Sequence, residues 1–354
     1  MNAARRLFLG GVAAMLAARA GAQGFAGLGT AVDGFALPDP AGWFDFPADH
    51  GAHDAFRIEW WYLTASLTGA DGAQYGIQWT LFRTALKPGG GEGWDSPTLW
   101  MGHAALTTST AHHVAERLAR GGVGQAGVVA VPFQAWIDEW AMTSLAGPAE
   151  DALAGISLTA RAKDFSYALR LQASGPLVAH GDNGYSVKSR DGHASRYYSQ
   201  PFYEVTGKIE VSSGPVEVTG QGWLDREWSS QPLSDNQTGW DWLSLMLDDG
   251  TRLMGYRMRD TRGDFTAASW IAPDGTVETL PNGSMVMTPQ RTARVADRDI
   301  PVEWTIEIAS KGLSVAITPL NDAAWMATSV PYWEGPVSAS GTHPGRGYLE
   351  MTGY

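Results

Sequence analysis

The chain of 354 residues lacks cysteine altogether and is poor in basic side chains. Without cysteine it forms no disulfide bonds, so its hydrophobic cores alone must hold it together. Its 25 Lys and Arg residues against 37 Asp and Glu residues give a formal charge of -12, which disfavours nucleic acid and anionic lipid headgroups as partners. Since a Gly-x-Ser-x-Gly elbow, a phosphate loop and a paired-cysteine motif are also missing, serine hydrolases, nucleotide-dependent enzymes and zinc fingers are excluded. The expected ligand is therefore neutral or apolar.

A hydrophobic run long enough to span a membrane is missing too. The apolar stretch Leu7 to Ala18 is too short to cross a bilayer of about 30 Å as a helix, so no transmembrane anchor is expected. Arg5-Arg6 precede this stretch and Ala20-Gly21-Ala22 follow it, as in a twin-arginine-type export signal with a small-residue cleavage site. We therefore predict that residues 1–22 are a signal peptide and that the mature protein is periplasmic.

Glycine, proline and tryptophan, by contrast, are abundant, with 43, 19 and 16 copies, which indicates many tight turns and broad flat contacts. After Pro40, apolar and polar residues alternate in short runs that end at Gly, Asp or Pro, the pattern of antiparallel strands. Such strands are expected at residues 58–67, 75–83, 99–107, 155–161 and 167–173. One short helix is expected at residues 111–119, where Val114 and Leu118 are four residues apart.

The second half of the chain repeats the pattern of the first. The strand, Asp-Gly turn and strand of residues 242–259 match those of residues 60–83 at a shift of about 180 residues. Gly222-Trp223-Leu224-Asp225 corresponds likewise to Gly347-Tyr348-Leu349-Glu350, each after a Gly-Pro-Val stretch. We therefore predict an all-β protein of two tandem antiparallel β-barrels, residues 40–220 and 221–354, whose strands join first to last and which can each hold one apolar ligand.

Ordered motifs run through nearly all of the predicted mature chain. They are Asp49-His50-Gly51-Ala52-His53, Phe56-Arg57-Ile58-Glu59-Trp60-Trp61-Tyr62, residues 76–83, residues 181–188, Tyr197-Tyr198-Ser199-Gln200-Pro201, residues 223–228, Gly239-Trp240-Asp241-Trp242 and residues 347–354. At these motifs the chain resembles the AttH-like and carotenoid 1,2-hydratase (CrtC) family, which is built from two lipocalin-like barrels. The resemblance implies two tandem lipocalin-like antiparallel β-barrels. The family includes hydratases and also exported proteins, often associated with ABC transporters, of undefined activity.

For the hydratases, the resemblance implies cofactor-free protonation of a terminal isoprenoid double bond, followed by addition of water to a tertiary carbocation. Such a site needs a carboxylic acid that burial keeps protonated near neutral pH and aromatic faces that stabilise the cation. The catalytic candidates are Asp225, Glu227 and Asp241, with Tyr256 to position the water. The ligand-binding candidates flank these acids or belong to the corresponding first-half signature: Glu59, Trp60, Trp61, Tyr62, Trp223, Arg226, Trp228, Trp240 and Trp242.

Two departures from the hydratase pattern favour the AttH-like side of the family. The hydratases carry His-x-Trp where this chain has Arg226-Glu227-Trp228, and Tyr-x-Asp where it has Tyr256-Arg257-Met258, so the hydratase acid is replaced by Met258. The first expectation is therefore an exported protein that binds an elongated lipid or isoprenoid, with an ABC transporter as a candidate partner. A carotenoid 1,2-hydratase-like hydro-lyase is the alternative, and neither function requires a cofactor.

The same signatures also have structural interpretations. In lipocalin-like barrels a first-strand tryptophan packs against an arginine from a late strand, so Arg83 or Arg226 would cover the Trp60-Trp61 pair and leave Glu59 paired rather than catalytic. Asp225 and Glu227 would share one face of their strand, with Arg226 on the other, and could tie the two barrels together through ion pairs.

A candidate metal site precedes the first of these signatures in the sequence. His50 and His53 lie beside Asp49 and Asp54 and have metal-ligand types and spacing, but no further ligand motif accompanies them, so no metal is expected.

Overall fold

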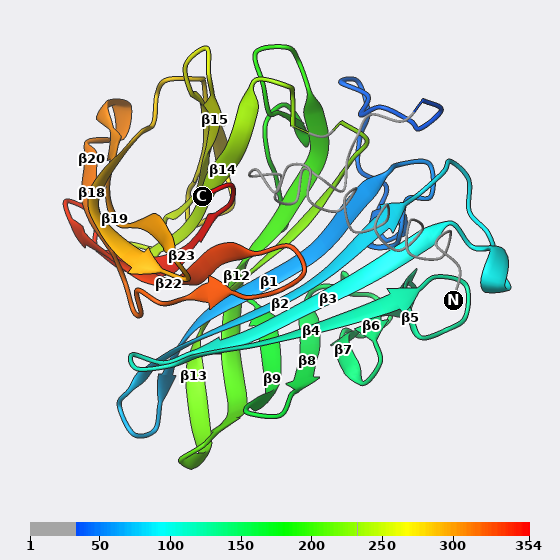
Figure 1. The fold of residues 1–354 in the computed structure, drawn as a ribbon, viewed down its shortest axis with the longest axis horizontal. Coiled ribbons are helices and arrows are strands. Elements are labelled where there is room, and N and C mark those ends of the chain that lie inside the picture. Colours follow the sequence, from blue (N-terminus) through cyan, green and yellow to red (C-terminus); the bar gives the residue numbers. More distant parts are fainter. Residues whose placement is uncertain (1–32, 232) are drawn as a thin grey trace, which may run out of the picture.

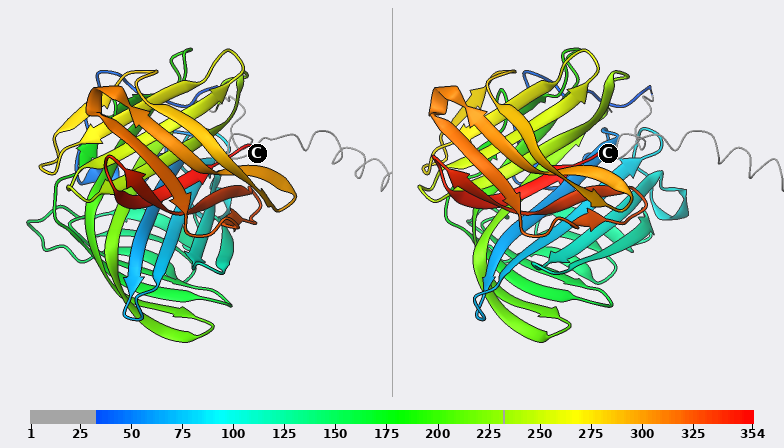
Figure 2. Two further views of the ribbon diagram at one scale, coloured as in Figure 1. Left: turned by 90° about the vertical axis from the view of Figure 1, so that its left-hand side faces the viewer. Right: turned by 60° about the vertical axis from the view of Figure 1, so that its left-hand side comes forward.

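A computed structural model describes residues 33–231 and 233–354, and the predicted signal peptide lies outside these residues. The described chain is built almost wholly of antiparallel strands in two sheets (Figure 1). The first sheet curls into a near-barrel and the second into a half-barrel, and the two lie against each other (Figure 2). The predicted all-β, lipocalin-like fold is confirmed.

The first sheet has the strand order β4-β3-β2-β1-β13-β12-β9-β8-β7-β6-β5, with β10 and β11 paired to β12. Its strands are β1 (Ile58–Gly69), β2 (Gln74–Ala85), β3 (Thr98–Thr107), β4 (His112–Arg120), β5 (Ala126–Ala130), β6 (Phe133–Ile137), β7 (Trp140–Ser144), β8 (Gly155–Arg161), β9 (Ser166–Ala173), β10 (Val178–Ala179), β11 (Tyr185–Val187), β12 (Ala194–Val211) and β13 (Gly214–Ser229).

The second sheet has the order β17-β16-β15-β14-β23-β22-β20-β19-β18, with β21 paired to β22. Its strands are β14 (Gln237–Leu247), β15 (Arg252–Asp260), β16 (Phe265–Ile271), β17 (Val277–Leu280), β18 (Val286–Val295), β19 (Arg298–Ile308), β20 (Leu313–Pro319), β21 (Trp325–Met326), β22 (Tyr332–Gly341) and β23 (Gly345–Met351). Three short 3-10 helices, η2 (Ala48–His50), η3 (Gly93–Asp95) and η4 (Ala309–Lys311), complete the described elements.

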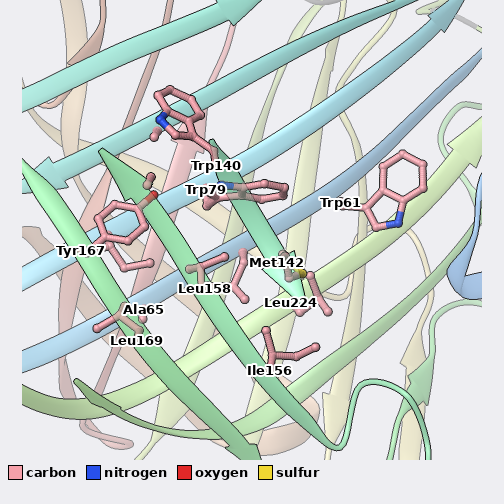
Figure 3. Packing of buried hydrophobic residues seen from close by; sticks show 14 of the residues in the cluster. Trp61, Ala65, Trp79, Trp140, Met142, Ile156, Leu158, Tyr167, Leu169 and Leu224 are labelled. Atoms are coloured by element: carbon pink, nitrogen blue, oxygen red, sulfur yellow. The ribbon is translucent and has the colours of Figure 1, made fainter. Parts of the chain in front are cut away.

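Alternation of side chains explains why these segments form strands. Along β9, for example, Tyr167, Leu169 and Leu171 are buried while the residues between them are more exposed, so one face of the strand lies on the core. Figure 3 shows part of that core, with Trp79 of β2 and Trp140 of β7 pointing into the interior of the first sheet. The second sheet encloses a separate core, and a third apolar cluster lies where the sheets meet.

The internal repeat is present as two equivalent strand arrangements. The first strand of each sheet pairs with the next strand through a turn whose glycine has positive φ, +79° at Gly72 and +92° at Gly250. Each first strand also pairs with its sheet's Gly-aromatic-Leu-acid strand, β1 with β13 and β14 with β23. The sheets change between β13 and β14, and the predicted domain division at residues 220 and 221 falls within β13.

Two details of the predicted fold are wrong. The expected helix at residues 111–119 is strand β4, because His112 to Arg120 pairs with β3 along its whole length, a long-range effect that outweighs the local spacing of Val114 and Leu118. The barrels are also not fully closed. In the described part of the chain no ladder joins β4 to β5 or β17 to β18, and the edge strand β5 instead contacts η2.

None of the helices in the described part of the chain has the length and apolar character needed to cross a bilayer.

Candidate active site

A pocket of about 150 Å³ lies between the two sheets. This volume holds a single ring or the branched end of a hydrocarbon chain. The first sheet and its loops contribute Ile58, Glu59, Trp60, Tyr62, Phe82, Arg83, Thr84, Lys188, Ala194, Ser195, Tyr197, Asp225, Glu227 and Ser229 to its wall. The linker and the second sheet contribute Gln231, Leu233, Gln237, Trp240, Trp242, Tyr256, Met258 and Glu350.

Asp225 on β13 is a buried carboxyl group in this wall. Burial raises its pKa to about 7, and the hydrogen bonds that oppose this rise come from Ser199, Trp223 and Tyr197. Trp223 Nε1 donates to Oδ1 at 2.6 Å and the Tyr197 hydroxyl donates to Oδ2 at 2.9 Å. Ser199 Oγ also donates to Oδ1. Asp225 is therefore a carboxyl group with a pKa near neutral pH and a fixed orientation.

Glu350 on β23 is a second carboxyl group in the same wall, and it is partly buried. Burial raises its pKa to about 7, a hydrogen bond from Trp240 opposes the rise, and the charges of Asp225 and Glu227 add to it. Trp240 Nε1 donates to Oε1 over 2.6 Å. The pocket thus receives one high-pKa carboxyl group from each sheet.

Glu227 shares the Asp225 face of β13 and is paired with the ammonium group of Lys188. Lys188 Nζ lies 2.8 Å from Glu227 Oε1, and Ser195 Oγ donates to the same oxygen. The ammonium group also lies 4.6 Å from the ring centroid of Tyr197 and 4.2 Å from that of Tyr256. Burial works against the charge of Lys188, but the neighbouring Glu227 outweighs it and the pKa of Lys188 is raised. The charge of Asp225 also contributes to the raised pKa of Lys188, but the salt bridge of Lys188 is made with Glu227.

Tyr256 and Met258 on β15 also line the pocket, on the side of the second sheet. The Tyr256 hydroxyl donates to the Val187 carbonyl, so it can still accept a hydrogen bond from a bound water. Met258 is the register partner of Trp240 and places a thioether where the hydratases are expected to carry a carboxyl group.

Asp241, the third acid predicted from the sequence, lies outside this wall. Since Trp240 and Trp242 line the pocket, alternation turns Asp241 to the opposite face of β14. There its carboxylate pairs with Arg257 at 2.7 Å and Arg259 at 2.5 Å, and accepts a hydrogen bond of 2.8 Å from the Tyr354 hydroxyl. The structure therefore separates Asp241 from Asp225 and Glu227.

Glu59, Trp61 and Arg226 form a buried ion network at one end of the first sheet. The Arg226 guanidinium group lies 3.9 Å from the Trp61 ring centroid, and its NH2 atom is 2.8 Å from Glu59 Oε1. Arg83 NH1 lies 3.7 Å from Glu59 Oε2, and His53 Nδ1 lies 2.6 Å from Oε1. Burial alone would raise the pKa of Glu59, but His53, Arg226 and Arg83 outweigh it and lower the pKa to about 2. Glu59 is therefore an ionised, paired group.

The predicted aromatic residues divide between the pocket and its surroundings. Trp60, Tyr62, Trp240 and Trp242 line the pocket. Trp223 contacts it only through its hydrogen bond to Asp225, Trp61 lies in the first core, and Trp228 stacks on the His53 ring at 3.8 Å.

The histidines near η2 are occupied by hydrogen bonds. His53 Nε2 lies 3.1 Å from Asp49 Oδ1, while His50 contacts the Tyr198 hydroxyl at 2.7 Å and Asp151 at 3.2 Å. Over residues 33–231 and 233–354, no group of three or more His, Cys, Asp or Glu side chains is arranged to hold a metal ion.

Several residues of the site were not predicted. Glu350 was recognised only as the end of a motif, although the internal repeat aligns it with Asp225. Lys188, Tyr197 and Ser199 also lay in recognised motifs, but only the folded structure brings them to Asp225 and Glu227.

Comparisons with known proteins agree with this architecture. The model of the AttH-like family matches residues 37–354. The crystal structure of a protein described as an AttH from Nitrosomonas europaea is 32% identical in sequence, with a TM-score of 0.78 over 90% of this chain and 100% of that protein. No curated protein sequence matches the chain.

Two more distant structures share the fold. Kievitone hydratase from Nectria haematococca is 15% identical, with a TM-score of 0.65 over 90% of this chain and 98% of that one. CghA, solved with Sch210972, is 12% identical, with a TM-score of 0.52 over 91% of this chain and 97% of that one.

Proposed function

This chain belongs to the AttH-like family, and we propose that it is a cofactor-free hydratase that adds water to a carbon–carbon double bond of an apolar small molecule. The observation that carries the proposal is the placement of Asp225, a carboxyl group with a pKa of about 7 in a pocket walled by aromatic rings. A protein that only binds an apolar ligand has no need of such a group. A carboxyl group whose pKa lies near the operating pH is instead suited to donate a proton.

The reaction begins with the protonated carboxyl group of Asp225. Its proton passes to one carbon of the double bond, and the π electron pair forms the new C–H bond. The other carbon becomes a tertiary cation, which the faces of Trp60 and Trp242 stabilise. A water molecule then forms the new C–O bond, and its surplus proton returns to the Asp225 carboxylate. The sum is one alkene and one water giving one tertiary alcohol, with Asp225 regenerated.

The pocket favours a ligand whose end, rather than whole length, is enclosed. A volume of about 150 Å³ suits one branched five-carbon end or one ring. The terminal double bond of an isoprenoid fits this description. One relative of this fold is a kievitone hydratase, which agrees with water addition as the reaction class.

Met258 separates this proposal from the usual hydratase pattern. With a thioether at that position, the proton donor must come from another part of the wall, and Asp225 is the acid of the first sheet that fits. Among the described residues of the pocket wall, Glu350 also has a carboxyl pKa raised to about 7. Asp225 is the more deeply buried of the two, and we assign proton donation to it.

The second candidate is a carrier that binds a lipid or isoprenoid end without changing it. It is favoured by the many aromatic side chains of the pocket wall. The twin-arginine-type signal expected at residues 1–22 would place either protein in the periplasm, where an ABC transporter is a candidate partner for a carrier. Both functions remain cofactor-free.

The experiment that separates the two is incubation of the purified mature protein with lycopene-type carotenoids in ¹⁸O-labelled water. The enzyme gives a product that has gained one labelled water, and Asp225→Asn reduces the rate on the order of 10²–10⁴-fold. Glu217→Gln, an exposed carboxyl change on the same strand, is the matched control and leaves the rate unchanged. Recovery of bound but unlabelled carotenoid from the native protein would support the carrier instead.

A further inference from the structure

Glu334 on β22 is a buried carboxyl group directly behind the pocket wall. It is the register partner of Glu350, and its Oε1 accepts a hydrogen bond of 2.5 Å from the hydroxyl of Tyr62. Glu350 and Tyr62 both line the pocket. Burial raises the pKa of Glu334 well above its usual range, and the charge of Glu350 adds to that effect. Burial therefore favours the protonated form of Glu334, whose carboxyl group contacts the pocket-lining Tyr62.

A chain of hydrogen bonds leads from Glu334 away from the pocket. Tyr332 precedes Glu334 by two residues on β22, so both side chains lie on one face of the strand, and the interaction of Tyr332 with the Glu334 carboxyl group lowers the pKa of Glu334. The Tyr332 hydroxyl lies 3.0 Å from His103 Nδ1. His103 Nε2 lies 3.2 Å from Glu116 Oε1. The side chain of Glu116 is 22% exposed, whereas that of His103 is fully buried. The chain thus connects solvent at Glu116 with the interior.

This hydrogen-bonded chain crosses from one sheet to the other. His103 and Glu116 belong to β3 and β4 of the first sheet, and Tyr332 and Glu334 belong to β22 of the second. The His103 and Tyr332 rings are stacked, with centroids 5.7 Å apart, which holds the crossing point in place. Each of these four side chains can both accept a proton and release one.

Within residues 33–231 and 233–354, no cation acts on the pKa of Glu334. The groups that act on its pKa are Glu350, Tyr62 and Tyr332, and its charge in turn acts on Tyr167 and Tyr348. No lysine or arginine of the described chain is among them. A purely structural link between the sheets would need only neutral hydrogen-bonding groups, whereas a buried carboxyl group is costly unless it holds a proton.

We propose that Glu334, Tyr332, His103 and Glu116 form a proton path that exchanges protons between solvent and the carboxyl groups of the pocket. Proton transfer along this path does not depend on the hydratase reaction. Its use in reprotonating Glu350 and Asp225 rests on that proposed function. The path gives these enclosed groups access to solvent protons while a ligand fills the pocket.

The outward transfer balances within the four residues. Glu116 is ionised, since the hydrogen bond from His103 lowers its pKa to about 2, and this assigns the resting proton of His103 to Nε2. The Glu334 carboxyl proton moves to the Tyr332 oxygen as the Tyr332 proton moves to His103 Nδ1. The proton on His103 Nε2 then moves to Glu116. Glu334 ends ionised, Glu116 ends protonated, and His103 is left as the other tautomer until an inward transfer restores it.

The test is a pH-jump measurement on the full mature protein without substrate, followed by infrared spectroscopy of the protonated-carboxyl C=O band. Loss of part of the band in Glu334→Gln and Glu350→Gln assigns it to these groups. In Glu116→Gln and His103→Gln, the rate at which the band responds falls about tenfold or more, since a missing proton-transfer group typically costs on the order of 10²-fold. Added imidazole buffer, a mobile proton carrier, restores the rate in Glu116→Gln.

Glu303→Gln, which alters a carboxyl group of similar exposure on β19, is the matched control and leaves the response rate unchanged. Thermal unfolding curves show whether a variant with a slow response is still folded. If His103→Gln does not fold, the surface variant Glu116→Gln still tests the path. Native response rates in folded Glu116→Gln would overturn the proton path. Failure of water addition together with a slowed response would instead overturn the hydratase and leave the path in place.

Discussion

Asp225 and Glu350 occupy equivalent positions in the two sheets and line the same pocket. Asp225 on β13 pairs in register with Tyr62 on β1, and Glu350 on β23 pairs in register with Trp242 on β14. All four side chains are in the pocket wall. The internal repeat therefore places two carboxyl groups of raised pKa where the sheets meet.

The two carboxyl groups are expected to influence each other's titration. Because the charge of Asp225 raises the pKa of Glu350, Asp225→Asn removes a repulsion and should lower the pKa of Glu350 below about 7. Infrared titration of the Glu350 band in the variant measures this shift. A pKa of Glu350 that stays the same or rises would show that the two groups do not interact.

Asp225 should make stability depend on pH. Its folded pKa of about 7 lies above the ordinary value of 3.8, so the folded state keeps a proton that the unfolded chain releases. The resulting stabilisation is complete below about pH 4 and is lost as the pH rises through about 7. A shift of about three units corresponds to about 4 kcal/mol.

Urea unfolding of the native protein and of Asp225→Asn at several pH values isolates the contribution of Asp225 to stability. The variant should gain free energy of unfolding relative to the native protein as the pH rises from about 4 to about 7. A constant difference between the two proteins over this range would contradict the raised pKa. The difference in free energy of unfolding between the two proteins is more informative than the pH dependence of either one. The reason is that Glu59, whose pKa is lowered, makes stability change with pH in the opposite direction in both proteins.

Removal of Arg226 should destabilise the fold strongly. Arg226→Ala takes the guanidinium group from Glu59 and from the Trp61 face, leaving a buried carboxylate with fewer partners. We expect a loss of about 3–5 kcal/mol in the free energy of unfolding. Arg294→Ala, in an exposed pair with Asp299, should change little. Equal effects of the two substitutions in urea unfolding would argue against a structural role for the Arg226 network.

Much of the fold follows from alternation and turn residues in the sequence. The strands expected at residues 58–67 and 75–83 are β1 and β2, and those at 155–161 and 167–173 are β8 and β9. The segment at residues 111–119 is a strand and not the expected helix. Two residues at helical spacing predict a helix only weakly, whereas pairing with β3 along the whole segment decides for a strand, and this pairing cannot be seen in the local sequence.

The site was predictable only in part, for reasons that differ between residues. Asp225 and Glu227 could be placed together because they alternate on one strand, and the same rule applied to Trp240 and Trp242 would have turned Asp241 away. Glu350 could have been found through its alignment with Asp225. Lys188 could not, because its contact with Glu227 depends on how the segment before β12 folds over the pocket.

The measurement that tests the hydratase most directly is the rate of water addition to a lycopene-type carotenoid as a function of pH, in the native protein and in Asp225→Asn. Because proton donation requires the protonated carboxyl group, kcat/KM should fall about tenfold per pH unit above about pH 7 and should be lower on the order of 10²–10⁴-fold in the variant. A rate that is independent of pH across this range, or one that is undiminished in Asp225→Asn, would contradict Asp225 as the proton donor.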